Sequence, residues 1–344
     1  MNEINETAVS DREVTAKATA RAFTEAEMIA CEACLRANPP TRATCLYCAA
    51  GLPATEQNLH AQSAPAPTPA ELDNGYQIVP ASAPARDIAE SSLAQAAALL
   101  ELKAVELKAI LNAPQPLPLA RAATPEQATM LGDKLRAVGI ENIMVADEEL
   151  HLKNPAKRIR AIEFRDDSLM GIAAGGSTKL STRLSDVILI VAGRLLVSRT
   201  EVEERPRGRR NQLLDSRELS RDESVLDLHL RSDQAGWRIL ADNFDFSCLG
   251  SEKKATAFAN FKVLVNLLRE RANDARFDDL YVRLRPALAL VWPIEQQTRK
   301  GKSRGRGDGK PYLSTVTTAD NEGQFTRYSR LGRYLKLREL EEGR

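Results

Sequence analysis

Two closely spaced cysteine pairs constrain the N-terminal part of this chain more than any other feature. Cys31 and Cys34 form one C-x2-C unit, and Cys45 and Cys48 form a second, within residues 28–53. A segment this short cannot bury enough apolar surface to offset its chain entropy. Four thiolates at this spacing can surround one tetrahedral metal ion. We therefore predict one structural zinc ion, held by these four cysteines in a small finger.

Other uses of the cysteines are two disulfides, a redox C-x-x-C pair or an iron centre. Outside the finger the chain has one further cysteine, Cys248, and its first residues lack a secretory signal. Both facts argue for a reducing compartment and against disulfides. A redox pair normally occurs singly beside a βαβ pattern. The donor set therefore favours zinc, with iron as the main alternative.

The full spacing of the finger is C-x2-C-x3-N-x6-C-x2-C, with Asn38 at the asparagine position. This pattern resembles the Ran-binding-protein family of zinc fingers. Members of that family are small zinc-held hairpin pairs that bind single-stranded RNA, ubiquitin or other proteins. The resemblance implies that Asn38 and Arg42 contact a partner.

The chain departs from both well-known binding modes of that family. RNA-binding members carry a tryptophan two residues before the first cysteine, where this chain has Ile29. Without an aromatic face for base stacking, the finger loses the main means of holding RNA. Ubiquitin-binding members carry Thr-Phe directly after the second cysteine, where this chain has Leu35 and Arg36. The resemblance therefore transfers metal ligation better than partner identity.

The overall composition is that of an ordinary globular chain. The 344 residues are 43% hydrophobic and 28% charged, with a formal net charge of +1. This length predicts two or three domains, and the charge gives no pull toward nucleic acid or membrane. The longest apolar stretch, 187–197, is too short to span a bilayer. We expect a cytoplasmic protein without a transmembrane segment or membrane-surface contact.

Residues 1–27 and 54–74 flank the finger with different polar compositions. Segment 1–27 is acidic and rich in alanine, which predicts disorder or marginal helix. Segment 54–74 is rich in Ala, Pro, Gln, Ser and Thr, a composition typical of a solvated spacer. The finger is therefore predicted to be tethered.

Residues 75–150 are predicted to form a small α+β module in the order β-α-α-β-α-β. Its last helix begins with Thr124 as N-cap and ends at Gly139, and a strand is expected before it at 117–120. The run ELKAILNAPQPLPLARAATPEQATMLGDKLRAVGIENIMV resembles the C-terminal domain of the ribosomal stalk protein and the related ClpS adaptor. Leu100 and Glu101 replace the stalk glycines that admit translation factors. Factor binding is therefore not expected.

Residues 158–297 are predicted to be mostly strands followed by an amphipathic helix. The expected strands are 159–164, 168–172, 183–191, 195–203, 225–230 and 236–241. A later helix carries its apolar positions on one face. This layout resembles a pleckstrin-homology-like domain, with a ferredoxin-like unit as the alternative. The predicted fold class is thus multidomain α+β: a small four-cysteine zinc finger, a βααβαβ module and a β-rich domain closed by a helix.

Two basic segments stand out. The run of arginines within 205–210 is flanked by acidic residues, which predicts a solvated hairpin tip or mobile loop. Residues 298–344 are predicted to be a basic disordered tail with a terminal helix. Within it, TRKGKSRGRGDGK at 298–310 weakly resembles Arg-Gly segments that associate with RNA.

Catalytic motifs are lacking in the sequence. His60, His151 and His229 lie outside any H-E-x-x-H or G-x-S-x-G context, and Cys248 is expected to be a buried small hydrophobe. We therefore predict a non-catalytic zinc-binding adaptor whose finger docks a macromolecular partner, most simply a protein. The alternative is an RNA- or ribosome-associated protein. The third candidate is an unrecognised hydrolase, with a site near His151 or His229.

Overall fold

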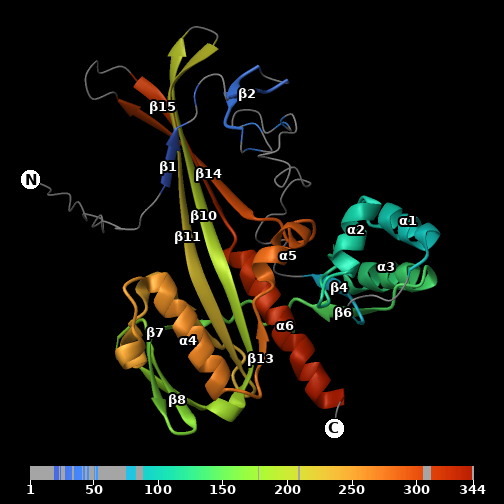
Figure 1. Ribbon diagram of the computed structural model, residues 1–344. Coiled ribbons are helices and arrows are strands. Elements are labelled where there is room, and N and C mark those ends of the chain that lie inside the picture. The colour runs from blue at the N-terminus through green and yellow to red at the C-terminus, as the bar shows by residue number, and fades with distance from the viewer. Residues whose placement is uncertain are drawn as a thin grey trace, which may run out of the picture.

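The computed structural model shows a mixed α/β chain with a curled sheet (Figure 1). It describes residues 19–22, 75–82, 88–176, 178–207, 210–304 and 311–342, with 24, 28–32, 35–40, 42, 45, 50 and 52 near the finger. For 19–22, 206–207, 210–214, 302–304 and 311–312 only the backbone is described.

The module following the spacer is built on a three-stranded antiparallel sheet in the order β5-β4-β6. Its elements are β4 (Tyr76–Pro80), α1 (Glu90–Leu99), α2 (Ala104–Leu111), β5 (Ala120–Ala122), α3 (Pro125–Ala137) and β6 (Asn142–Ala146). This order of elements agrees with the order expected from the sequence. The resemblance to the stalk and ClpS families stays a prediction.

Local chemistry explains where α3 begins and ends. The Thr124 hydroxyl accepts the N–H of Gln127 at 3.3 Å, and Pro125 occupies the first turn. Gly139 follows the helix with φ of +87°, a conformation that favours glycine. The strand before α3 lies slightly later than expected. Leu117 and Leu119 instead form a buried approach to it, in which the Leu119 N–H bonds the Ile78 carbonyl at 2.8 Å.

The larger sheet has the strand order β14-β15-β10-β11-β12-β7-β8-β9, with β1 on β11 and β13 on β10. Its strands are β7 (Lys157–Arg165), β8 (Ser168–Ala173), β9 (Lys179–Arg183), β10 (Val187–Arg207), β11 (Arg210–Leu230), β12 (Trp237–Leu240), β13 (Arg276–Asp278), β14 (Glu295–Arg304) and β15 (Pro311–Asp320). Helices α4 (Ala257–Arg271), α5 (Tyr281–Leu288) and α6 (Glu322–Glu342) pack against it, and short 3-10 segments cover Leu184–Asp186, Ala241–Asn243 and Phe246–Glu252.

One half of this sheet curls around α4. β7, β8 and β9 follow one another as antiparallel neighbours, and β12 joins β7 in parallel at Trp237–Ile239. The face of α4 that carries Phe261, Leu264 and Leu268 is buried in the same apolar cluster as Trp237. The predicted helix is thus the element that covers the inside of this curl.

The other half is a long hairpin arm made of β10 and β11, which Figure 1 shows rising away from α4. The prediction of separate strands at 183–191 and 195–203 is wrong, because β10 runs unbroken past Gly193. A Cβ atom at Gly193 would lie 2.6 Å from Cε2 of Phe325. Glycine at this position therefore admits an aromatic ring and does not mark a turn.

The prediction of disorder in the basic tail is also wrong for residues 298–304 and 311–320, which form strands, whereas the terminal helix predicted within 298–344 is present as α6. β14 pairs with β15 from Glu295↔Asp320 to Arg304↔Pro311, and β15 pairs with the outer part of β10. Thr315 and Thr317 of β15 are buried and Val316 between them is half-buried, which suits a half-buried strand, and the basic segment pairs with it as an edge strand. Residues 305–310 lie outside the described part.

Helix α6 holds the molecule together. Phe325, Tyr328 and Leu331 belong to one apolar cluster that also contains Leu107 and Leu135 of the module. Figure 1 shows α6 running between the module and the curled half of the sheet. The predicted terminal helix is therefore a core element and not a solvated appendage.

Polar contacts join the same parts of the molecule. The Trp292 indole N–H donates to Gln77 Oε1 at 3.1 Å, and the Gln324 amide donates to the Trp292 carbonyl at 2.6 Å. Gln115 of the module bonds the Tyr328 hydroxyl, which in turn donates to Asp278 at 2.9 Å. All these side chains are buried, so their hydrogen bonds fix the module against α6.

The N-terminal segment contributes one strand, β1 (Thr19–Ala22), which pairs antiparallel with β11 at Arg217–Ser220. The prediction of disorder or marginal helix for 1–27 is therefore wrong at these four residues. Because β1 lies on the edge of the arm, the chain that enters the finger starts from a fixed point on the sheet. The spacer 54–74 lies outside the described residues.

Candidate functional site

The first cysteine pair begins in a small hairpin. β2 (Ile29–Ala30) pairs with β3 (Ala37–Asn38) in antiparallel register. Within this hairpin the Cys31 N–H donates to the Arg36 carbonyl at 2.9 Å, and the Leu35 N–H donates to the Cys31 carbonyl at 2.7 Å. The backbone therefore folds back tightly just after Cys31.

The second pair starts with the same backbone contact. The Cys45 N–H donates to the Ala50 carbonyl at 2.7 Å, so that in both halves the first cysteine bonds the carbonyl five residues later. Cys31 and Cys45 are both buried and share a small apolar cluster with Leu52. The two halves thus bury their first cysteines in a common interior, each with the same backbone hydrogen bond.

Asn38 lies inside this interior and not on its surface. Its exposed fraction is 0%, and its Nδ2 donates to the Arg36 carbonyl at 2.8 Å and to the Cys45 sulfur at 3.5 Å. The prediction that Asn38 contacts a partner is therefore corrected, since its amide is engaged within the finger. An N–H donor on a sulfur favours the thiolate form that binds metal.

The remaining predicted ligands, Cys34 and Cys48, lie outside the described residues. Among those that are described, no group of three or more His, Cys, Asp or Glu side chains could hold a metal ion. Arg42 is half-buried, and its backbone N–H donates to the Pro39 carbonyl at 3.2 Å. Fourfold zinc ligation therefore stays a prediction, supported by the arrangement of Cys31 and Cys45.

Leu35 was not singled out as a contact residue from the sequence. Its side chain is 78% exposed, and its φ is +57°, in the left-handed region that favours glycine. A leucine in this position therefore has a strained backbone and loses the stabilisation that burial of its side chain would give. The sequence signal for Leu35 was its position directly after the second cysteine. The chain turns back there, so that the Arg36 carbonyl can accept the N–H of Cys31.

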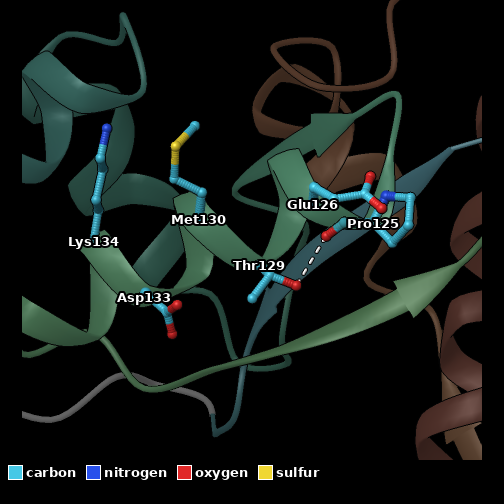
Figure 2. Close-up of a pocket in the computed structure, with 6 residues that line it drawn as sticks. All are labelled: Pro125, Glu126, Thr129, Met130, Asp133 and Lys134. Atoms are coloured by element: carbon cyan, nitrogen blue, oxygen red, sulfur yellow. Dashed lines mark hydrogen bonds between the residues drawn. The ribbon is translucent and has the colours of Figure 1, made fainter.

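A shallow depression follows one side of α3 (Figure 2). It is lined by Pro125, Glu126, Thr129, Met130, Asp133 and Lys134. The Thr129 hydroxyl donates to the Pro125 carbonyl at 2.9 Å, and Met130 is exposed. One helix supplies every lining residue, so the depression is an open surface and not an enclosed site.

A buried polar cluster of Asp227, His229, Arg238 and Ser329 lies between the sheet and α6. Arg238 donates from Nε and Nη2 to the two carboxylate oxygens of Asp227, at 2.7 and 2.8 Å. The Ser329 hydroxyl donates to Asp227 Oδ2 at 2.7 Å and lies 2.6 Å from His229 Nε2. Because the Ser329 proton is directed to Asp227, His229 Nε2 must be the donor to Ser329.

Burial controls protonation in this cluster. It lowers the pKa of His229 to about 3, so the imidazole is neutral near pH 7. Burial acts to raise the pKa of Asp227, yet the charge and hydrogen bonds of Arg238 outweigh it, and this pKa is lowered. The result is a permanent buried ion pair beside a neutral histidine.

The remaining groups considered from the sequence are His60, His151 and Cys248. His60 lies outside the described residues, and His151 lies in the turn between the module and β7. Cys248 belongs to the 3-10 segment before α4, where burial raises the pKa of its thiol to about 11. The thiol is therefore protonated near neutral pH and a poor nucleophile.

Comparisons with protein-family models, with curated proteins and with solved structures gave no match for this chain. Among the helices of the described part, none combines the length and apolar composition needed to cross a bilayer.

Proposed function

We propose that this chain is a non-catalytic zinc-binding adaptor whose finger docks a protein partner. The observation that carries the proposal is the matched geometry of the finger. Cys31 and Cys45 are buried together in one small cluster, and each donates its N–H to the carbonyl five residues later. Cys34 and Cys48 would complete the ligand set, and a bound ion would supply the stability that the cluster of two cysteines and Leu52 lacks.

Zinc fits this interior chemically. Tetrahedral zinc favours thiolates, and the N–H of Asn38 directed at Cys45 supports the charged sulfur. Structural zinc contributes about 10 to 16 kcal/mol to finger peptides at neutral pH. That contribution exceeds what burial of one leucine can give, about 2 kcal/mol.

Leu35 is the proposed anchor for the partner. It is exposed beside the metal-holding turn, and its strained backbone is a feature that clusters at functional sites. The strand β1 brings the chain onto the arm just before the finger, so the anchor is presented from a fixed base. A single apolar side chain on a rigid turn suits a small apolar pocket on another protein.

The test combines metal analysis with partner capture. Purified full-length protein is expected to contain one zinc per chain, and the double variant Cys31→Ser with Cys48→Ser is expected to contain none. Cys248→Ser, which removes the cysteine outside the finger, is the matched control and should keep its zinc. Retention of zinc by the double variant would refute the assigned ligands.

Leu35→Ser tests docking separately from metal binding. This variant is expected to keep its zinc while losing the proteins captured by the wild type, whereas Val105→Ser, at an exposed apolar position on α2, should capture them unchanged. An identical set of captured proteins for wild type and Leu35→Ser would contradict the docking role.

Association with RNA is a second candidate, favoured by the position of the basic residues on β14. Arg299 and Lys300 are exposed on the edge strand of the sheet, where phosphate groups could reach them. Replacing both with glutamate should weaken RNA binding and reduce its salt dependence. The matched control is Lys179→Glu with Arg183→Glu on β9, at the opposite end of the strand order. Equal binding by both double variants would exclude a role for β14.

A proposal about fold family accompanies the functional one. The meander of β7 to β9, the return of β12 to β7 and the covering helix α4 support a pleckstrin-homology-like unit with an extended hairpin arm. The order of elements from β4 to β6 supports the stalk- and ClpS-like module. Both likenesses concern architecture and carry no activity with them.

A hydrolase centred on His229 is disfavoured by the buried polar cluster. His229 and Ser329 have exposed fractions of 1% and 0%, so a substrate cannot approach them in this conformation. An activated serine must also donate its proton to the histidine, whereas Ser329 donates to Asp227. The hydrogen bonds of Ser329 with Asp227 and His229 instead attach α6 to β11 of the sheet.

A further inference from the structure

Helix α6 buries two arginines on the side that faces the turn leading out of the module. Arg330 and Arg333 are 3% and 6% exposed, and their spacing of three residues places them on one helix face. Buried guanidinium groups are normally paired with carboxylates or fully hydrogen-bonded. Among the residues that the structure describes, Arg330 and Arg333 have neither a carboxylate bonded to them nor a full set of hydrogen bonds.

The contacts of Arg330 use one end of its guanidinium. Its Nη2 donates to the carbonyls of Asn154 and Ala235, at 2.8 and 2.6 Å. Its Nη1 is buried without a hydrogen-bond partner among the described residues, and so is the Nε of Arg333. Two neutral carbonyls do not compensate the charge of Arg330, and one donor on each arginine remains unused.

The nearby carboxylates are already engaged. Both oxygens of Asp227 accept from Arg238, and one also accepts from Ser329. Asp233, whose negative charge acts, against burial, to raise the pKa of Arg333, accepts a hydrogen bond from Lys157 Nζ at 2.8 Å. Arg238 and Lys157 thus balance the two acids, and Arg330 and Arg333 leave an excess of two positive charges in a desolvated layer.

Besides burial, the positive charges of Arg330 and Arg333 lower the pKa of two histidines. Burial lowers the pKa of His151, and the charges of Arg333 and Arg330 lower it further. The same two arginines act in the same direction on the pKa of His229, after burial. Geometry places Arg330 at the turn that connects the module with β7: its Nη2 bonds the Asn154 carbonyl, and the Asn154 N–H donates to the carbonyl of the half-buried His151 at 3.0 Å.

We propose that Arg330 and Arg333 form a binding site for a doubly charged tetrahedral oxyanion, a phosphate or a phosphate monoester group, at the junction between the module, α6 and the turn between β11 and β12. The unused donors, Nη1 of Arg330 and Nε of Arg333, would each donate to an oxygen of the anion. A dianion would neutralise the two excess charges, and the half-buried His151 lies on the turn whose Asn154 carbonyl Arg330 holds. Since Arg330 also holds the carbonyls of both turns, the anion would strengthen the joint between the module and the sheet.

The experiment uses the full-length protein and isothermal titration with inorganic phosphate, glycerol 3-phosphate and acetate at matched ionic strength. Inorganic phosphate should bind saturably with one site per chain, and acetate more weakly because it carries one charge. Binding of inorganic phosphate alone identifies the free ion as the ligand, and binding of the ester as well identifies a phosphate monoester. Absence of saturable binding by both phosphates, or equal binding of acetate, overturns the proposal.

Arg333→Met tests the assigned residue. We expect its phosphate affinity to fall about 10-fold or more, as for loss of one charge-assisted hydrogen bond. Arg338→Met is the matched control on the same helix, because the Arg338 side chain is 43% exposed and pairs with Glu342 at 2.6 Å. It should bind phosphate as the wild type does. If Arg333→Met does not fold, Arg333→Lys keeps the charge but loses the Nε donor. Binding by that variant, or by Arg333→Met, at wild-type affinity would refute the site.

Discussion

The ring of Phe325 lies directly over the backbone of Gly193. A Cβ atom on Gly193 would come within 2.6 Å of Phe325 Cε2 and 3.1 Å of Tyr281 Cδ1. Phe325 and Tyr281 themselves meet edge to face, with ring centroids 5.0 Å apart. The long strand β10 and helix α6 therefore approach each other closely only because this strand position has no side chain.

Replacement of Gly193 by valine should destabilise the fold by about 1 to 3 kcal/mol, the usual range for overpacking a core. The added methyl groups must displace Phe325 or Tyr281, both of which are buried. Urea unfolding followed by circular dichroism measures the effect. Gly175→Ala is the matched control, since no atom lies within 4 Å of its added Cβ. Equal midpoints for the two variants would contradict the contact.

Asp227→Asn should cost about 3 to 5 kcal/mol of unfolding free energy, because it removes one partner of a buried ion pair and leaves Arg238 undercompensated. Both members of the pair are buried, and Glu322 offers Arg238 only one further contact, at 3.1 Å. Asp222→Asn provides the comparison, because its pair with Arg194 is half-exposed and should contribute no more than about 1 kcal/mol. Similar losses for both variants would show that burial of the pair does not matter.

The order of elements could be predicted from the sequence where local signals and burial agree. Thr124, Pro125 and Gly139 mark α3 by chemistry that acts within a few residues, and the structure uses each of them as expected. Of the predicted apolar face of α4, Phe261, Leu264, Val265 and Leu268 are buried, whereas Phe258 is 45% exposed. Short-range capping and periodicity decide these elements, so the sequence window that contains them is sufficient.

The strands of the tail and the unbroken length of the arm could not be predicted, because they depend on contacts with residues far away in the sequence. β14 carries two Lys, two Arg and few apolar residues, and its pairing with β15 supplies the stabilisation that its own composition lacks. Gly193 resembles a turn signal until Phe325, far along the chain, is placed on it. Arg330 and Arg333 look like surface residues of a basic helix, and only the packing of α6 between two bodies buries them.

Of the candidate site, zinc ligation by the four cysteines stays a prediction, and the inward position of Asn38 could not be predicted from the sequence. A pattern of spacing shows that a residue type recurs at a position, but it does not show which way the side chain points. The hydrogen bonds from Asn38 to Arg36 and Cys45 show that it points inward. Exposure of Leu35 is likewise a property of the folded turn.

The stability of the protein should fall on mild acidification because His229 is buried in its neutral form. Burial holds its pKa at about 3 in the folded state, whereas an unfolded histidine titrates near 6.5. The unfolded state therefore binds more protons below pH 6.5, and stability is lost as the pH falls from 6.5 toward 3. Between pH 7.5 and 5.0 this linkage amounts to about 2 kcal/mol.

Urea unfolding at these two pH values measures the linkage directly. His229→Gln cannot titrate and should flatten the dependence over this range, even if it is less stable at pH 7.5. A wild-type protein with the same unfolding free energy at both pH values would show that His229 is not held neutral.

Asn38→Ala should weaken zinc binding without removing a ligand. Asn38 donates to the sulfur of Cys45 and to the carbonyl of Arg36, the same carbonyl that accepts the N–H of Cys31. Its amide thus connects the two halves of the finger, and loss of such a supporting contact typically lowers metal affinity about 10- to 100-fold. Competition with a chromophoric chelator measures this affinity, and Arg42→Ala is the control within the same finger. Unchanged affinity in Asn38→Ala, or an equal fall in Arg42→Ala, would mean that the amide does not support the metal site. A fall confined to Asn38→Ala would instead tie the buried amide to the metal through Cys45, the sulfur that it contacts.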